Sequence, residues 1–446
     1  MKNKVPQGLV LALFLFVLPM LSWADNMLDA FELAIDNDPN LKAAQYARKA
    51  LLEEHSQTLA KYFPTITLYS HVDKTAQDLK QVAFDNQPPA PSLLRTTTFS
   101  NINFGINLKQ PIFNLANFRN RNVSEVKVIQ AELNYRISQE DLIYRIAERY
   151  FAVLAAQDAL NFARAEKNAI ARQLKQTKER FKIGLTAVTD VHEAQARHDM
   201  ALAQEIKAES ELADVKEAMR RVTGKLHNRL AMLKADTPLI PPSPSNMNDW
   251  IDAARDQNLH IAQQKLEADL IVEKMGVTRA GHFPTLDFNA SYGYNKYGGP
   301  FFTESLDAII SLDFNMTLFK GNIIASKIRQ AQFKLDQKIQ EIDAKEREIL
   351  QQTRSAYLGI LADMSYVKAL GQAMKSSEQA LKATNAGFDV GTRTAIQVLD
   401  AQRELFRSQR DYSSARYEYI LNMLRLKMAV GLLSIDDIEQ INSWLQ

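Results

Sequence analysis

Residues 390–402, VGTRTAIQVLDAQ, have a near relative earlier in the chain, IGLTAVTDVHEAQ at 183–195. When the sequence is shifted by 207 positions, residues 180–224 lie on 387–431 without a gap. A repeat of this kind has to be recognised first, because it governs the whole fold. The chain therefore contains an internal duplication.

The two halves differ in length between their repeated segments. AKYFPTITL at 60–68 is repeated as AGHFPTLDF at 280–288, but with a shift of 220, so the first half carries an insertion. The insertion falls around 84–101, whose Pro, Asn, Ser and Thr residues are typical of a loop. We therefore divide the chain after residue 24 into a first repeat (25–234), a Pro-rich connector (235–247), a second repeat (248–431) and a C-terminal segment (432–446).

Residues 1–24 have the pattern of an export signal that is removed from the mature chain. Two early lysines precede an apolar run, and Ser-Trp-Ala at 22–24 is a small-x-small cleavage site. The expected mature chain begins at Asp25 and loses two positive charges from a net charge of +2. A neutral chain is not expected to bind nucleic acid. The absence of cysteine excludes disulfides, thiol catalysis and thiolate metal sites.

Each half contains one very long helical segment. Between Ile112 and Ile183 there is neither Gly nor Pro, and apolar residues recur at steps of three, four or seven, which is coiled-coil spacing. A helix over about 119–182 is roughly 95 Å long at 1.5 Å per residue. Helices at about 29–61 and 190–224 are each near half that length, so we expect them to stack end to end beside it. An ordinary helical bundle is the alternative.

Alternating segments predict two strands in each half. Apolar and polar side chains alternate at 101–110, 285–297 and 310–318, and most weakly at 65–73. This period suits transmembrane barrel strands, although a soluble half-buried sheet shows it too. Four strands cannot close a barrel, and lipid tolerates no open edge, so several chains must share one. Two copies give eight strands and a filled lumen, and three give twelve and an open pore.

Several motifs resemble the TolC family of outer-membrane efflux channels. They are MLDAFELAIDNDPNLKAA at 27–44, FPT at 63–65 and 283–285, LKQPIFNLANFR at 108–119, RFKIGLTAVTDV at 180–191 and VGTRTAIQVLDA at 390–401. The resemblance implies a mainly α fold whose long hairpins form a periplasmic α-barrel. It implies four strands per chain in a twelve-stranded β-barrel shared by a homotrimer in outer-membrane lipid.

The same resemblance implies the function of a passive exit duct, without enzymatic activity or cofactor. Members of the family are recruited by a periplasmic adaptor and an inner-membrane transporter for drug efflux or type I protein secretion. The transporter carries the specificity in this family, so the sequence leaves both kinds of cargo open. Most of the chain is then periplasmic, and the repeated turn is the tip of a helical hairpin.

Two glycines suit these tips. Gly184 and Gly391 accept the left-handed backbone that a reversal between helices often needs. Candidate caps of the outgoing helices are Thr186 or Thr189 at the first tip and Thr392 or Thr394 at the second. The resemblance implies that Ile183, Gly184, Leu185, Val390, Gly391 and Thr392 dock the adaptor.

Charged residues beside the tips are the candidate gate. Arg393, Gln397 and Asp400 have the spacing of one helical stripe, and the equivalent stripe of the first repeat contains Asp190. We therefore expect Arg393 and Asp190 to pair across packed hairpins. The resemblance implies that such links close the tunnel mouth, with Arg393, Asp190, Thr189 and the aromatic Phe388 as their members. A solvated helix face is the alternative.

Two positions depart from the best-known pattern of the family. Phe388 lacks the hydroxyl with which a Tyr would join the network. Gln397 stands where one of two ring-forming Asp residues would be, which leaves Asp400 as the only acidic ring position. The resemblance therefore implies at most a ring of three carboxylates at the entrance.

Other functional classes find little support in the sequence. The seven histidines form no ligand spacing, so no metal site is expected. There is no Gly-rich phosphate loop, so energy has to come from a partner. An exported hydrolase lacks a nucleophile and base constellation. The remaining rival is a periplasmic coiled-coil scaffold or adaptor that keeps its strands in a soluble sheet.

Overall fold

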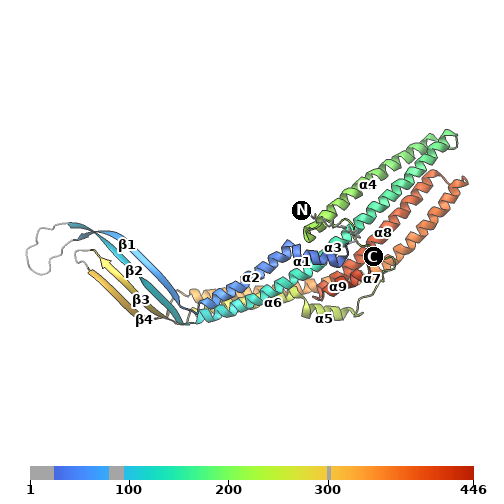
Figure 1. The fold of residues 1–446 in the computed structure, drawn as a ribbon. Coiled ribbons are helices and arrows are strands. Elements are labelled where there is room, and N and C mark those ends of the chain that lie inside the picture. The colour runs from blue at the N-terminus through green and yellow to red at the C-terminus, as the bar shows by residue number, and fades with distance from the viewer. Residues whose placement is uncertain (1–24, 80–94, 299–302) are drawn as a thin grey trace, which may run out of the picture.

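A computed structural model describes residues 25–79, 95–298 and 303–446. The chain is elongated, with a sheet at one end, long helices through the middle and two hairpin tips at the other end (Figure 1). The predicted export signal, 1–24, and much of the predicted insertion around 84–101 lie outside the described residues. Among the described helices, none combines the length and apolar character that crossing a bilayer requires.

The two halves contain the same elements in the same order. The first half has α1 (Met27–Asn37), α2 (Pro39–Ala60), β1 (Thr65–Leu79), β2 (Arg95–Asn114), α3 (Leu115–Lys182) and α4 (Val188–Thr223). The second half has α5 (Met247–Gln257), α6 (Leu259–Ala280), β3 (Thr285–Tyr297), β4 (Thr303–Asn315), α7 (Ile323–Asp389) and α8 (Ala395–Ala429), and α9 (Ile435–Ser443) follows. The predicted mainly α fold with an internal duplication is confirmed.

The predicted single helix over 29–61 is two helices, α1 and α2. Asp38 separates them and caps α2, and Pro39 occupies the first turn, where a missing N–H costs nothing. Within each half the shorter helices flank the long one: α2 and α4 pack on α3, and α6 and α8 pack on α7. The predicted end-to-end arrangement along the long helix is therefore correct (Figure 1).

The strands form one antiparallel sheet in the order β1-β2-β3-β4. β3 has the predicted bounds, whereas β1 and β2 are longer than predicted. The prediction for 310–318 was wrong at both ends, because β4 spans Thr303–Asn315 and pairs with β3 only as far as Thr285 opposite Asn315. β3 begins at Thr285, directly after Pro284, so no residue of β3 lies opposite residues 316–318.

The sheet has one apolar and one polar face. Leu68, Ile106, Tyr292 and Ala308 lie opposite one another across the four strands, and His71, Asn103, Asn295 and Ser305 do so on the other face. The apolar face is bare, with Leu68 81% and Ile310 76% exposed. Within the described residues, neither β1 nor β4 has a partner on its outer edge.

Two equivalent junctions, where α2 follows α1 and where α6 follows α5, have capping residues at the same position but with different charge. Asp38 is 1% exposed, accepts from Leu41 N at 2.7 Å, and receives both terminal nitrogens of Arg145 at 3.0 and 3.2 Å. Asn258 is the equivalent cap of α6, and Gln352 stands at the position equivalent to Arg145. The first half therefore neutralises a buried carboxylate that the second half does not contain.

We expect Arg145→Gln to lower the stability of the helical part by about 3 kcal/mol, because Asp38 is left buried without its cation. The double variant Asp38→Asn with Arg145→Gln copies the second half and should regain most of the loss. Thermal unfolding of the detergent-solubilised protein, followed by helical circular dichroism, measures both. A double variant no more stable than Arg145→Gln alone would contradict the account.

A cavity of about 350 Å³ lies beside α1 and α3, between Phe31, Leu41, Ile143 and Leu433. Glu140 also lines it, and burial raises the pKa of this carboxyl from 4.5 to about 7, with Arg136 opposing the shift. Because the folded pKa lies above the unfolded one, the contribution of the protonated carboxyl to stability is complete below about pH 4.5. It is lost as the pH rises through about 7.

The variant Glu140→Gln should therefore match the parent protein in melting temperature at pH 4.5 and exceed it at pH 8. The amide keeps the shape of the side chain but cannot ionise, so position 140 no longer loses stability as the pH rises. Thermal unfolding at the two pH values checks the prediction. An equal difference between parent and variant at both values would refute the raised pKa.

Candidate functional site at the hairpin tips

The two tips have the same backbone. Leu185 N donates to Arg180 O at 2.9 Å, and the equivalent Thr392 N donates to Gly387 O at 2.8 Å. Gly184 and Gly391 have φ values of 75° and 81°, which confirms the predicted left-handed turns. A Cβ at either glycine would meet nothing within 4 Å, so backbone conformation alone favours glycine there.

The helices that leave the tips are capped differently. Thr394 caps α8 by accepting from Gln397 N at 3.3 Å, and Gln397 Oε1 accepts from Thr394 N at 3.0 Å, a reciprocal capping box. At the first tip the predicted threonine cap was wrong. Ala187 occupies the cap position of α4, and Thr186 instead donates its hydroxyl hydrogen to Asp190. This bond orients the Asp190 carboxylate.

The predicted gate residues do not meet within one chain. Arg393 lies in the turn before α8, so it shares no helical stripe with Gln397 and Asp400. Its side chain lies against Gly387, where a Cβ would be 2.7 Å from Arg393 Cγ. Among the described residues, neither Arg393 nor Asp190 is part of an ion pair. Thr189 is exposed in the first turn of α4.

Both tips expose their apolar residues. Ile183 is 71%, Leu185 70% and Val390 76% exposed, and Gly391 and Thr392 are exposed beside them. The predicted docking residues therefore form two small apolar ends. They lie at the extremity of the molecule, away from the sheet (Figure 1).

Asp400 is not a free carboxylate. Arg197 Nη1 of α4 lies 3.0 Å from Asp400 Oδ1, and Arg403 approaches the same oxygen at 3.7 Å. Arg197 also donates to Glu193 at 3.2 Å. Arg197 was not predicted as a site residue, although Glu193 and Asp400 are equivalent in the two repeats and Arg197 follows Glu193 by one helical turn. This ion pair joins the first hairpin to the second.

Two further contacts join the hairpins within the chain. The guanidinium of Arg180 lies 4.1 Å from the ring centroid of Phe388, which is 6% exposed, so the aromatic residue acts through its face. Leu399 of α8 is 1% exposed and packs between α3 and α4. Its buried neighbours are Ile170, Leu174, Ala194 and Ala201. We call Arg180–Phe388, Leu399 and Arg197–Asp400 together the hairpin seam.

The energetics of the seam are mainly apolar. Burial of a Leu side chain contributes about 1.5–3 kcal/mol, whereas a partly exposed ion pair contributes about 0–1 kcal/mol. Arg197 and Asp400 are 24% and 46% exposed, so their pair belongs to the weaker class.

At the first tip, the hydrogen bond from Lys182 lowers the pKa of Glu179. No group of three His, Asp or Glu side chains suitable for a metal ion occurs in the part of the chain that the structure describes.

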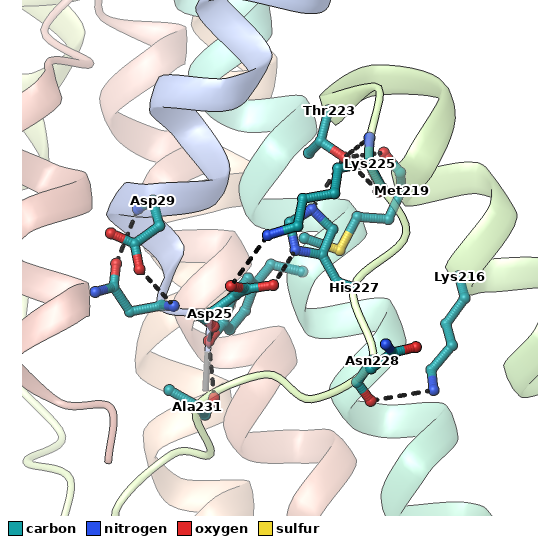
Figure 2. Close-up of polar contacts among 11 residues, drawn as sticks. Asp25, Asp29, Lys216, Met219, Thr223, Lys225, His227, Asn228 and Ala231 are labelled. Atoms are coloured by element: carbon teal, nitrogen blue, oxygen red, sulfur yellow. Dashed lines mark hydrogen bonds and ion pairs between the residues drawn. The ribbon is translucent and has the colours of Figure 1, made fainter. Parts of the chain in front are cut away.

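A second polar cluster fixes the start of the described chain. His227 is 2% exposed, with Nδ1 2.8 Å from Asp25 Oδ2 and Nε2 3.0 Å from Thr223 Oγ1 (Figure 2). Lys225 lies 3.6 Å from the same carboxylate, and Asp25 N donates to Arg229 O at 3.0 Å. Because both ring nitrogens of His227 have partners, the cluster anchors the chain and offers no open ligand position.

Comparison with known proteins agrees with this geometry. A family model described as outer membrane efflux protein matches residues 30–225 and 250–432. The outer membrane protein TolC of Vibrio cholerae is 35% identical over 429 residues, which cover 95% of this chain and 94% of that protein. The alkaline protease secretion protein AprF of Pseudomonas aeruginosa is 26% identical over 440 residues, which cover 96% and 89%.

Solved structures share the fold at lower identity. The crystal structure of the Campylobacter jejuni CmeC outer membrane channel matches with a TM-score of 0.74 and 14% identity, covering 94% of this chain and 90% of that one. The sheet and the helical hairpins thus have the arrangement of an outer-membrane channel subunit. As the sequence motifs implied, the chain belongs to the outer membrane efflux protein family, whose members lie in the outer membrane.

Proposed function

We propose that three copies of this chain form an exit duct that crosses the outer membrane and extends through the periplasm. The observation that carries the proposal is the four-stranded sheet, whose apolar face is bare and whose outer edges have no partner strand in the part of the chain that the structure describes. A soluble scaffold would not leave Leu68, Ile310 and Leu312 between 67% and 81% exposed. Lipid solvates these side chains well.

The open edges require more than one copy, and an open lumen sets the number of copies at three. In lipid each backbone N–H and C=O needs a partner, so β1 of one copy must pair with β4 of the next until the barrel closes. Twelve strands from three copies leave an open lumen, whereas eight strands are filled by side chains. The polar face then lines the lumen, and the helices continue the same wall into the periplasm.

The tips close the duct in this proposal. Among the described residues, Arg393 and Asp190 form no ion pair, and the Thr186 hydroxyl already orients the Asp190 carboxylate. We assign their pairing to neighbouring copies, with Thr189 and Phe388 beside the contact. The hairpin seam holds the two hairpins of one chain together behind these links. The entrance carboxylate Asp400 is neutralised by Arg197, so it serves the seam instead of a cation-binding ring.

The partners follow from what the tips expose. Ile183, Leu185 and Val390, on the turns made by Gly184, Gly391 and Thr392, offer six small apolar ends in a trimer to a periplasmic adaptor protein. Energy comes from an inner-membrane transporter, and the duct itself carries out no reaction. The family description names efflux and one relative is named for protease secretion, which makes both drugs and proteins candidate cargo.

The gate is tested by single-channel conductance in planar bilayers. The parent protein should give small steps, and Arg393→Ser should give steps several times larger, because a charge-assisted link at the mouth is removed in each copy. Arg407→Ser is the control, since Arg407 lies farther along α8 and pairs with Asp411 at 3.7 Å. Folded, oligomeric protein that never conducts in any form would rule out the duct.

The seam is tested by comparing two arginines that share one carboxylate. Arg197→Gln removes the 3.0 Å pair with Asp400. The variant should conduct more, because each chain loses a contact that contributes about 1 kcal/mol to the stability of the closed state. Arg403→Gln removes only the 3.7 Å contact and should leave conductance unchanged. Equal effects of the two substitutions, or none from Arg197→Gln, would show that the seam does not hold the closed state.

A further inference from the structure

A tyrosine lies across two glycines on the polar face of the sheet. Tyr69 of β1 is opposite Gly105 of β2, which is opposite Gly293 of β3, so the three share one row across the strands. Both glycines are buried, although the polar residues before and after them on this face are half-buried. Neither glycine has a positive φ, so the backbone does not explain why glycine stands there.

Space explains the two glycines. A Cβ at Gly293 would lie 2.8 Å from the Tyr69 hydroxyl oxygen, and a Cβ at Gly105 would lie 2.9 Å from it. The tyrosine side chain therefore extends from β1 over β2 to β3, flat against the sheet. Gly105 also lies close to the backbone of β3, with 2.7 Å from its Cβ position to Tyr292 O. At Gly293, the atom nearest to an added Cβ is the phenol oxygen of Tyr69.

The recess lies on the face that lines the lumen in the proposed duct. Polar side chains of the same face, such as Asn295, Ser305 and Asp307, are half-buried, whereas Leu306 and Ile310 on the opposite face are 63% and 76% exposed. Asn295 and Ser305 both donate to Asp307, at 2.7 and 2.9 Å. The polar side chains beside the recess thus lie against the sheet and bond to one another.

We propose that Gly105 and Gly293 form a recess that holds the phenol of Tyr69 against the barrel wall and out of the path of the cargo. This inference rests on the proposed duct, in which three such rings surround the lumen at one level. A flat ring offers cargo a smooth aromatic surface, whereas a ring displaced from the recess points inward and narrows the lumen. Tyr69 is then a wall residue whose flat position keeps the lumen wide at this level.

The test is a double-variant cycle of conductance, carried out in the Arg393→Ser background so that the tips do not limit the current. Gly293→Ala places a methyl group where the phenol lies and should lower conductance by roughly 1.2- to 2-fold, given the limited lumen of a twelve-stranded barrel. In a Tyr69→Ser background the same Gly293→Ala change should have no effect. Ser291→Ala, on the same strand and face without a phenol above it, is the control.

Thermal unfolding of the same proteins gives a second measurement that needs no current. Gly293→Ala should lower the melting temperature when Tyr69 is present and not in the Tyr69→Ser background. An equal loss in both backgrounds overturns the recess. If Gly293→Ala lowers the melting temperature only when Tyr69 is present but leaves conductance unchanged, the recess exists and the proposed role of Tyr69 in the lumen is overturned. If the Arg393→Ser protein itself never conducts, the proposed duct fails, and unfolding still decides whether the recess exists.

Discussion

The unpaired edges of an amphipathic four-stranded sheet are the constraint on which the rest of the structure depends. An open edge is tolerated in water only with protection, and in lipid it is not tolerated at all. The described residues of one chain supply a bare apolar face and two open edges, so in the proposed duct other copies complete the barrel. The long helices leave one end of the sheet (Figure 1) and, in the proposed duct, extend the shared wall away from the membrane.

Duplication gives the chain two hairpins of the same backbone and of different chemistry. The buried cap is an ion pair between Asp38 and Arg145 in the first half, whereas Asn258 is a neutral cap in the second. At the tips, Ala187 leaves Thr186 free to orient Asp190, while Thr394 is used in a capping box. Such differences give the two hairpins different contacts, although their backbones are the same.

The sequence predicted the elements well and the contacts between them poorly. Periodicity and the absence of Gly and Pro identified α3, and the repeated turn identified both tips. Strand ends were missed because they depend on the partner strand: β4 ends at Asn315, opposite Thr285, where β3 begins. The contacts of Arg197 with Asp400 and of Arg180 with Phe388 depend on how two hairpins pack, which local patterns do not record.

The most direct test of the account is disulfide cross-linking between the tips, which the natural absence of cysteine makes clean. A protein with Asp190→Cys and Arg393→Cys is oxidised and its mass is measured under denaturing conditions. If links between neighbouring chains close the mouth, oxidation should give a covalent species of three chains, since each chain then links to both neighbours. Conductance should be lost, and a reductant should restore it. A bond formed only within single chains, in protein that remains oligomeric, would contradict the account.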